Sequence, residues 1–202
     1  MQYGGVYMWY EKEILDYLKI NLKESRFRHS LSVSETAIEL ATQYGEDTEK
    51  ARIAGLVHDC VKNKTDQQLI KLAIDHEIEL DEIYVQNPSI LHGLVGSIIA
   101  NEVMGINDED ILNAIHYHTT GRKNMSILEK IIYIADYIEP LRKFDGVEEL
   151  RNLCKLDLDA ALLNSFDNTI KYVISQKQLL HIDTIDARNY LLSKHSGVEY
   201  EK

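Results

Sequence analysis

Histidines are the side chains of this sequence best suited to chemistry, because imidazole binds metal ions and carries protons near neutral pH. The chain has eight of them. On a helix, at about 100° per residue, four of the eight lie at or near the end of an apolar stripe and are expected to face a core. These four are His29, His58, His92 and His118.

The remaining histidines, His76, His116, His181 and His195, lie off such stripes. Lone polar residues of this kind are usually exposed, so we expect these four at the surface. His116 stands two residues before His118 and is therefore predicted to point to the far side of the same helix.

Two aspartates accompany the core-facing histidines. Asp59 directly follows His58, and Asp136 lies in the apolar stretch KIIYIADYIEP. A carboxylate drawn toward a core is costly unless it is paired or bound to a metal ion. Asp136 therefore has two interpretations, a salt bridge to Arg142 or Lys130, or a metal ligand. Asp59 taken alone could equally be a helix-end or surface acid.

The six residues form an ordered series, H…HD…H…H…D, spread over separate predicted helices. Imidazole nitrogens and carboxylate oxygens suit iron, manganese, zinc and other divalent ions. A helical bundle can hold two metals when such groups converge from facing helices. In the competing interpretation, a purely structural bundle, the histidines are core fillers and no metal copurifies.

Helical periodicity dominates the rest of the chain, and strand-type alternation is hard to find. We expect breaks at Gly45, Asn87-Pro88, Gly105, Gly121, Pro140 and Gly146, with Asp47 and Asp108 as N-caps. The predicted helices span residues 10–24, 28–44, 48–58, 66–76, 90–104, 108–118, 126–138, 157–177 and 184–195.

This pattern predicts an all-α helical bundle with short connections. We expect a loose tail over residues 1–9 and one domain over 10–195, with the metal-ligand core at about 28–142. The helices over 157–195 could cover the site, extend the core or form a homodimer face.

The 202-residue chain carries 22 Lys+Arg against 33 Asp+Glu, a formal net charge of −11. This acidic balance argues against binding to nucleic acid or an anionic membrane, because no basic excess exists to displace counterions.

Cys60 and Cys154 are too few and too far apart for a disulfide framework. Neither a membrane span nor a signal peptide is recognisable. We expect a cytoplasmic protein, with Met8 as a candidate alternative start.

The ordered series resembles the pattern of the HD superfamily of metal-dependent phosphohydrolases, which have an all-α core. Within that superfamily, the local strings resemble the bacterial YqeK family of symmetrical bis(5′-nucleosyl)-tetraphosphatases, over roughly residues 10–190. The strings are R-F-R-H-S at 26–30, H-D-C-V-K at 58–62, L-H-G at 91–93, Y-H-T-T-G-R at 117–122 and Y-I-A-D-Y-I-E-P-L-R at 133–142.

The resemblance implies a hydrolase that splits diadenosine tetraphosphate (Ap4A) into two ADP with a metal-bound hydroxide as nucleophile. It implies two divalent ions, iron first, with manganese, cobalt and zinc as alternatives. The ligands it implies for the first ion are His29, His58, Asp59 and Asp136. Asp59 would bridge to a second ion held by His92 and His118.

An acidic protein needs local positive groups to bind a polyphosphate. Lys62 follows one turn after the His-Asp pair, Arg122 follows the Thr119-Thr120-Gly121 turn, and Arg142 follows the Asp136 helix. We expect Lys62 and Arg122 to act in catalysis by neutralising the phosphate chain and the leaving ADP. The turn and Arg142 would add phosphate contacts. Each cation also has a plain alternative, as a solvated lysine or an ion-paired arginine.

Two further functions share this pattern. One is another HD phosphohydrolase acting on a nucleotide, such as a nucleoside 5′-monophosphatase or a (p)ppGpp hydrolase. The other is an HD module that senses nucleotides without cleaving them, which loss of a metal ligand would favour; all six positions are filled here. In each case the expected partner is a small dinucleoside polyphosphate or nucleotide.

Overall fold

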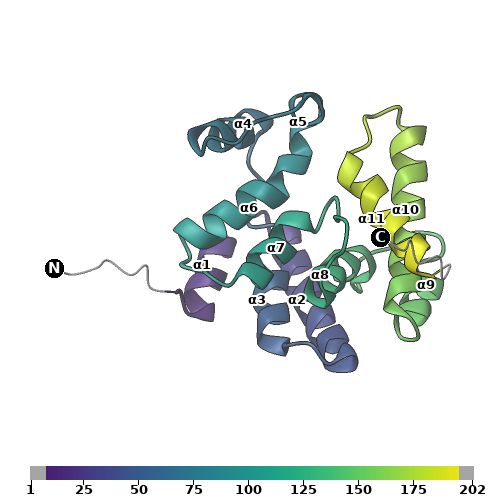
Figure 1. Cartoon of the computed structure of the whole chain (residues 1–202). Helices are drawn as coiled ribbons and strands as arrows, with labels where there is room; N and C mark the ends of the chain where they lie inside the picture. Colours follow the sequence, from purple (N-terminus) through teal and green to yellow (C-terminus); the bar gives the residue numbers. More distant parts are fainter. Residues whose placement is uncertain (1–7, 196–202) are drawn as a thin grey trace, which may run out of the picture.

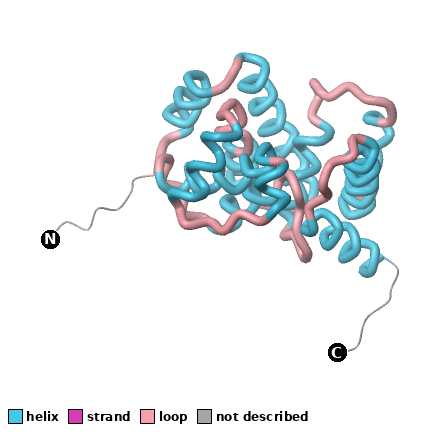
Figure 2. Tube along the Cα trace, turned by 90° about the horizontal axis from the view of Figure 1, so that it is seen from above, coloured by secondary structure: helices cyan, strands magenta, loops and turns pink. Residues whose placement is uncertain are grey.

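The computed structural model describes residues 8–195, without the side chain of His195. The predicted all-α class is confirmed: Figure 2 shows helices joined by loops, with no strand in the described range. The elements are α1 (Glu11–Asn21), α2 (Glu24–Tyr44), α3 (Thr48–Val57), α4 (Asp66–Asp75), α5 (Glu82–Gln86), the 3-10 helix η1 (Pro88–Ile90), α6 (Leu91–Glu102), α7 (Glu109–Tyr117), α8 (Ile127–Ile138), α9 (Val147–Cys154), α10 (Leu158–Ser175) and α11 (Ile182–His195). None of these helices is long and apolar enough to cross a bilayer.

The helices are arranged around a central bundle (Figure 1). α2 and α3 pack on each other and on α8, while α3, α6 and α8 pack on α7. α4, α5 and η1 lie on the α6 side of this bundle, and α10 packs on α8, α9 and α11 on the other side. The bundle therefore has α7 and α8 near its middle, with the C-terminal helices stacked beyond α8.

The ends of three central helices are fixed as the sequence predicted. Asp47 and Asp108 are the N-caps of α3 and α7, and each side chain accepts hydrogen bonds from the amides two and three residues later. Gly45 closes α2 in the left-handed conformation, at φ 69°. These caps satisfy backbone groups that a helix end leaves unpaired.

The predicted helix over residues 10–24 is confirmed as α1, but α1 ends three residues earlier than predicted and α2 already begins at Glu24. Leu22 and Lys23 are extended between α1 and α2, and Leu22 is buried. The Lys23 amide also donates to Asn63 Oδ1 at 2.7 Å. No Gly or Pro marks this break, since it is set by burial and by a contact far along the chain.

The sequence pattern also does not predict three short elements, α5, η1 and α9. α9 has only eight residues and depends on tertiary contacts. The Arg151 guanidinium donates to the carbonyls of Ile138 and Glu139, each at 2.7 Å, and to that of Arg142 at 3.1 Å. These contacts lie outside α9 itself, so local periodicity carries no sign of them.

Two glycines let the central helices approach each other closely. A Cβ on Gly55 of α3 would lie 2.7 Å from the Ser34 Cα of α2. A Cβ on Gly93 of α6 would lie 2.4 Å from the His116 carbonyl oxygen of α7. Both neighbours are backbone atoms that cannot move aside easily, so the spacing of these helix pairs requires glycine.

Both cysteines are free and buried, as expected from the absence of a disulfide framework. Burial raises the pKa of the Cys60 and Cys154 thiols to about 12.

At the N-terminal end of the described residues, Trp9 donates its amide to the Met104 carbonyl at 2.9 Å. Residues 1–7 of the predicted tail lie outside the described residues.

We expect Gly93→Ala to lower the free energy of unfolding by about 2 kcal/mol, because the added methyl meets the α7 backbone. Gly96→Ala on the same helix is the matched control, since its Cβ meets its nearest neighbour at 3.4 Å, an ordinary contact. It should change stability by no more than about 1 kcal/mol. Urea unfolding followed by circular dichroism measures both variants, and equal losses would contradict the close-approach account.

Candidate metal centre

The six residues of the ordered series converge in the central bundle. They are His29 on α2, His58 at the end of α3, Asp59 just after it, His92 in the first turn of α6, His118 at the end of α7 and Asp136 in the last turn of α8. Their donor atoms form three overlapping groups, each within 4.8 Å. The predicted inward direction of the four histidines is confirmed, since all four are buried.

Asp59 joins two halves of this cluster through its two carboxylate oxygens. Oδ2 lies 3.5 Å from His58 Nε2 and 3.9 Å from His29 Nε2. Oδ1 lies 3.2 Å from His92 Nε2 and 3.6 Å from His118 Nε2. Each oxygen thus faces its own histidine pair, which is the arrangement expected of a carboxylate that bridges two cations.

Asp136 belongs to the half that contains His29 and His58. Its Oδ1 lies 2.9 Å from His29 Nε2 and 3.9 Å from His58 Nε2. The same oxygen accepts a hydrogen bond from Arg142 at 2.5 Å, so the predicted salt bridge and the predicted ligand position coexist. Lys130, the other predicted partner, pairs with Asp159 instead.

The second ring nitrogen of each histidine is engaged outside the cluster. The Nδ1 atoms of His58, His92 and His118 lie 2.7, 2.5 and 2.7 Å from the carbonyl oxygen three residues earlier. His29 Nδ1 lies 3.0 Å from a carboxylate oxygen of Glu139. A carbonyl or carboxylate accepts only from N–H, so each ring carries its proton on Nδ1 and presents the Nε2 lone pair to the cluster.

Several buried atoms in the cluster have no hydrogen-bond partner in the described structure. These are His29 Nε2, His58 Nε2 and Asp59 Oδ1. Buried polar atoms are normally satisfied, because leaving one unpaired costs about 1–3 kcal/mol. Convergent lone pairs on imidazole and carboxylate fit divalent first-row metals, so the residues present fit the two-metal site.

The ionisation of the cluster also suits metal binding. Burial acts to raise the pKa of the Asp59 carboxyl, but His58 and Lys62 hold that pKa well below its usual value. Burial likewise opposes ionisation of Asp136, and the neighbouring His29, His58 and Arg142 side chains keep its pKa below its usual value. Burial lowers the pKa of His92 to about 4. Near neutral pH these groups are therefore two carboxylates and a neutral imidazole, the forms that bind metal.

Three cations surround the two carboxylates. Arg26 Nη1 lies 2.8 Å from Asp59 Oδ2, and Lys62 Nζ lies 3.7 Å from Asp59 Oδ1 and 2.9 Å from His92 Nε2. Arg142 holds Asp136. All three side chains are partly exposed, so they mark the open side of the cluster. The sequence singled out Lys62 and Arg142 but not Arg26.

The Thr119–Arg122 stretch divides into one residue at the cluster and three with other contacts. Thr119 Oγ1 lies 3.0 and 3.1 Å from the Nε2 atoms of His92 and His118. The Gly121 amide donates to the Tyr117 carbonyl at 2.8 Å. The Thr120 hydroxyl is buried and donates to the Gly121 carbonyl at 3.0 Å.

Arg122, predicted to contact phosphate, is paired with a buried acid. Its Nε lies 2.6 Å from Glu129 Oε1, and its guanidinium lies over the Tyr117 ring at 4.6 Å. Glu129 is itself the N3 residue of the capping box of α8. In this arrangement Arg122 connects the end of α7 to the start of α8.

Of the four histidines predicted at the surface, His181 is buried, so the prediction for this residue is wrong. It is 8% exposed and lies against the Tyr84 ring, with 5.1 Å between ring centroids. It precedes α11 in a loop, where helical phase predicts nothing. His116 is half-buried and stacks on Tyr117, and burial lowers its pKa to about 4. The half-buried His76 pairs with Glu102, and the side chain of His195 lies outside the described part.

Glu139 contacts the cluster, although the sequence did not single it out. It is 1% exposed, accepts from His29 and also accepts from the Leu141 amide at 2.7 Å. Such a carboxylate–histidine pair orients a metal-binding imidazole and raises its basicity. The available signal was a second carboxylate one turn after Asp136, just before Pro140.

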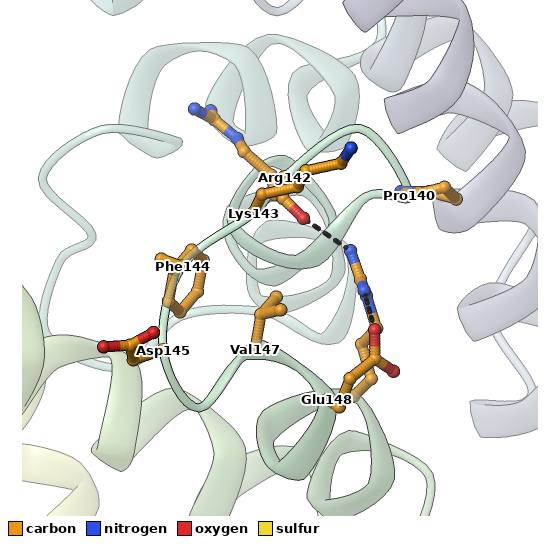
Figure 3. Close-up of a pocket in the computed structure, with 8 residues that line it drawn as sticks. Pro140, Arg142, Lys143, Phe144, Asp145, Val147 and Glu148 are labelled. Atoms are coloured by element: carbon orange, nitrogen blue, oxygen red, sulfur yellow. Dashed lines mark hydrogen bonds and ion pairs between the residues drawn. The ribbon is translucent and has the colours of Figure 1, made fainter.

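The loop after α8 leaves a cavity of about 460 Å³, lined by residues from Pro140 to Arg151. In Figure 3 the side chains of Arg142 and Lys143 extend from this loop away from Val147 and Glu148. Arg142 lines this cavity, and its guanidinium donates to the side chain and the carbonyl of Asp136.

Residues 26–141 match the family model described as HD domain, and this range contains all six converging residues. The chain belongs to the HD domain family. The predicted membership of the HD superfamily is thereby confirmed, together with the helical fold that it implies.

Individual relatives narrow this class. A Halalkalibacterium halodurans protein named "Bis(5'-nucleosyl)-tetraphosphatase, symmetrical" is 43% identical over 178 residues, which are 88% of this chain and 95% of that protein. A Bacillus subtilis protein of the same name is 42% identical over 182 residues, 90% of this chain and 97% of that protein. A Clostridium acetobutylicum crystal structure described as a predicted HD superfamily hydrolase involved in NAD metabolism has a TM-score of 0.91 and 57% identity. The match covers 93% of this chain and 100% of the Clostridium acetobutylicum chain.

We expect His118→Ala to remove metal from the second half of the cluster, because His118 Nε2 is one of its few donors. His116→Ala is the matched control, since the His116 ring stacks on Tyr117. Metal analysis of the purified proteins by mass spectrometry should show a reduced metal-to-protein ratio for the first variant and a wild-type ratio for the second. The reverse result would contradict the assignment of the ligand set.

Proposed function

We propose that this protein hydrolyses diadenosine tetraphosphate symmetrically, to two ADP. The observation that carries the proposal is the division of Asp59, whose two oxygens face separate histidine pairs. Two adjacent cation positions are what an in-line phosphoryl displacement uses. Relatives that this chain covers over almost their full length bear the name of the symmetrical activity.

His29, His58 and Asp136, with Asp59 Oδ2, would hold one ion, and His92 and His118, with Asp59 Oδ1, the other. When bound, such ions neutralise phosphoryl oxygens and lower the pKa of the attacking water. Iron is our first choice, and the same donors accept manganese, cobalt or zinc.

The charges around the cluster favour a polyanionic substrate. Arg26, Lys62 and Arg142 offset the three carboxylates of Asp59, Asp136 and Glu139. The protein groups alone are therefore close to neutral, and divalent ions leave a positive excess that needs an anionic ligand. A tetraphosphate bridge, with a negative charge on each phosphate, meets that need despite the acidic balance of the whole chain.

Lys62 and Thr119 are placed to act directly on the phosphates. Lys62 is one-third exposed beside Asp59 Oδ1, so its ammonium can turn to the leaving ADP. The Thr119 hydroxyl stands at the Nε2 atoms of His92 and His118 and can donate to a phosphoryl oxygen. Arg142 offers a second cation beside Asp136. Arg122 forms an ion pair with Glu129, and its role is to position the turn that carries Thr119.

Product analysis tests the proposal. We expect purified protein to convert Ap4A to ADP as the sole nucleotide product, to lose this activity on chelation and to regain it with Fe²⁺ or Mn²⁺, with the nucleotides separated by chromatography. ATP plus AMP would contradict symmetrical cleavage. Turnover of a nucleoside monophosphate or (p)ppGpp without turnover of Ap4A would favour another HD phosphohydrolase. Metal-loaded protein that cleaves none of them would indicate a sensor.

We expect Lys62→Ala to reduce kcat/KM for Ap4A by about tenfold or more, because it removes a charge-assisted contact to phosphate. Lys64→Ala, two residues later, is the matched control and should retain wild-type kinetics. Metal content is measured in both, so that a loss of metal is not mistaken for a loss of phosphate binding. Full turnover by Lys62→Ala with intact metal would remove Lys62 from the mechanism.

A further inference from the structure

Arg26 is given no contact to substrate in the mechanism above, yet it makes the shortest contact of any described cation to Asp59. Its Nη1 atom donates to Asp59 Oδ2 at 2.8 Å. Arg26 lies on α2 one turn before His29, so both side chains project from the same face of that helix. The guanidinium therefore sits directly beside the first half of the cluster.

The position of Arg26 complements that of Lys62. Arg26 contacts Asp59 Oδ2, the oxygen that faces His58 and His29, whereas Lys62 lies nearest Oδ1, which faces His92 and His118. Each carboxylate oxygen of Asp59 thus has a cation of its own. The Arg26 side chain is 29% exposed and the Lys62 side chain 34%, so both reach the open side.

We propose that Arg26 is a phosphate-binding residue of the first half of the site. It contacts a phosphoryl group on the Oδ2 side of Asp59, whereas Lys62 neutralises one on the Oδ1 side. The inference rests on the proposed function for its substrate class, a nucleoside polyphosphate.

Electrostatics gives the reason. Arg26 and a divalent ion held by His29 and His58 would share the same carboxylate oxygen, and two cations at one oxygen repel each other. Only Nη1 of the guanidinium has a partner among the described residues. The remaining N–H donors form the planar fork that suits a phosphate, which binds in bidentate fashion. A polyphosphate placed at the metals offers Arg26 an anion within its reach.

The competing role for Arg26 is to hold Asp59 in place and nothing more. The two roles differ in what they do to metal and to nucleotide. A residue that only holds Asp59 supports metal binding, so its loss weakens the metal and leaves the affinity of loaded protein for nucleotide unchanged. The loss of a phosphate-binding residue weakens the binding of nucleotide to the loaded protein and does not weaken the binding of metal.

The test compares wild type with Arg26→Ala, Arg26→Lys and Arg28→Ala, using calorimetric titration of Mn²⁺ and then of ADP into the Mn²⁺-loaded protein. Arg28, on the same helix, is exposed and has no ion pair within the described residues, so its variant is the matched control. We expect Arg26→Ala to bind ADP about tenfold more weakly, to bind Mn²⁺ at least as tightly as wild type and to raise KM for Ap4A. Arg26→Lys should recover part of the ADP affinity, and Arg28→Ala should match wild type.

Weaker Mn²⁺ binding with unchanged ADP affinity in Arg26→Ala would overturn the inference in favour of the holding role. Wild type that binds ADP but does not cleave Ap4A would contradict the proposed function, while the comparison of Arg26 variants would still decide the role of Arg26. Wild type that fails to bind ADP would overturn both.

Discussion

A buried carboxylate shared between two histidine pairs is the constraint on which the rest of this structure depends. Asp59 is 1% exposed, and an ionised carboxylate at such a depth is stable only with cations or strong donors around it. Arg26 and Lys62 supply such cations in the protein alone. The same oxygens would be shared between the two metal ions of the proposed site. The helices of the central bundle bring five further candidate ligands to this one side chain.

Helix ends explain how the bundle does so. His58 and His118 are the C-cap residues of α3 and α7, where carbonyl oxygens have no partner within the helix. The Gly55 and Ile115 carbonyls accept the Nδ1 protons of these histidines, so backbone satisfaction and imidazole orientation are achieved by the same hydrogen bonds. The negative ends of both helix dipoles also lie at the cluster, where they favour cations. Close helix packing at Gly55 and Gly93 sets the ligands at the required spacing.

The sequence predicts much of this arrangement because periodicity reports which face of a helix is buried. The inward direction of His29, His58, His92 and His118 follows from apolar stripes, and the caps at Asp47 and Asp108 from residue type. His181 could not be predicted in this way, since its burial depends on Tyr84 and not on a helix of its own. Arg26 and Glu139 contact residues 33 and 110 positions away in the chain, and the pair of Arg122 with Glu129 connects α7 to α8 across a turn. Such contacts are fixed by the folded backbone, and spacing along the chain does not reveal them.

The most direct measurement is anomalous X-ray diffraction, near the manganese absorption edge, from crystals of the Mn²⁺-loaded protein. We expect two anomalous peaks on either side of Asp59, one at Oδ2 with His29, His58 and Asp136, the other at Oδ1 with His92 and His118. A single ion, or two ions that do not share Asp59, would contradict it.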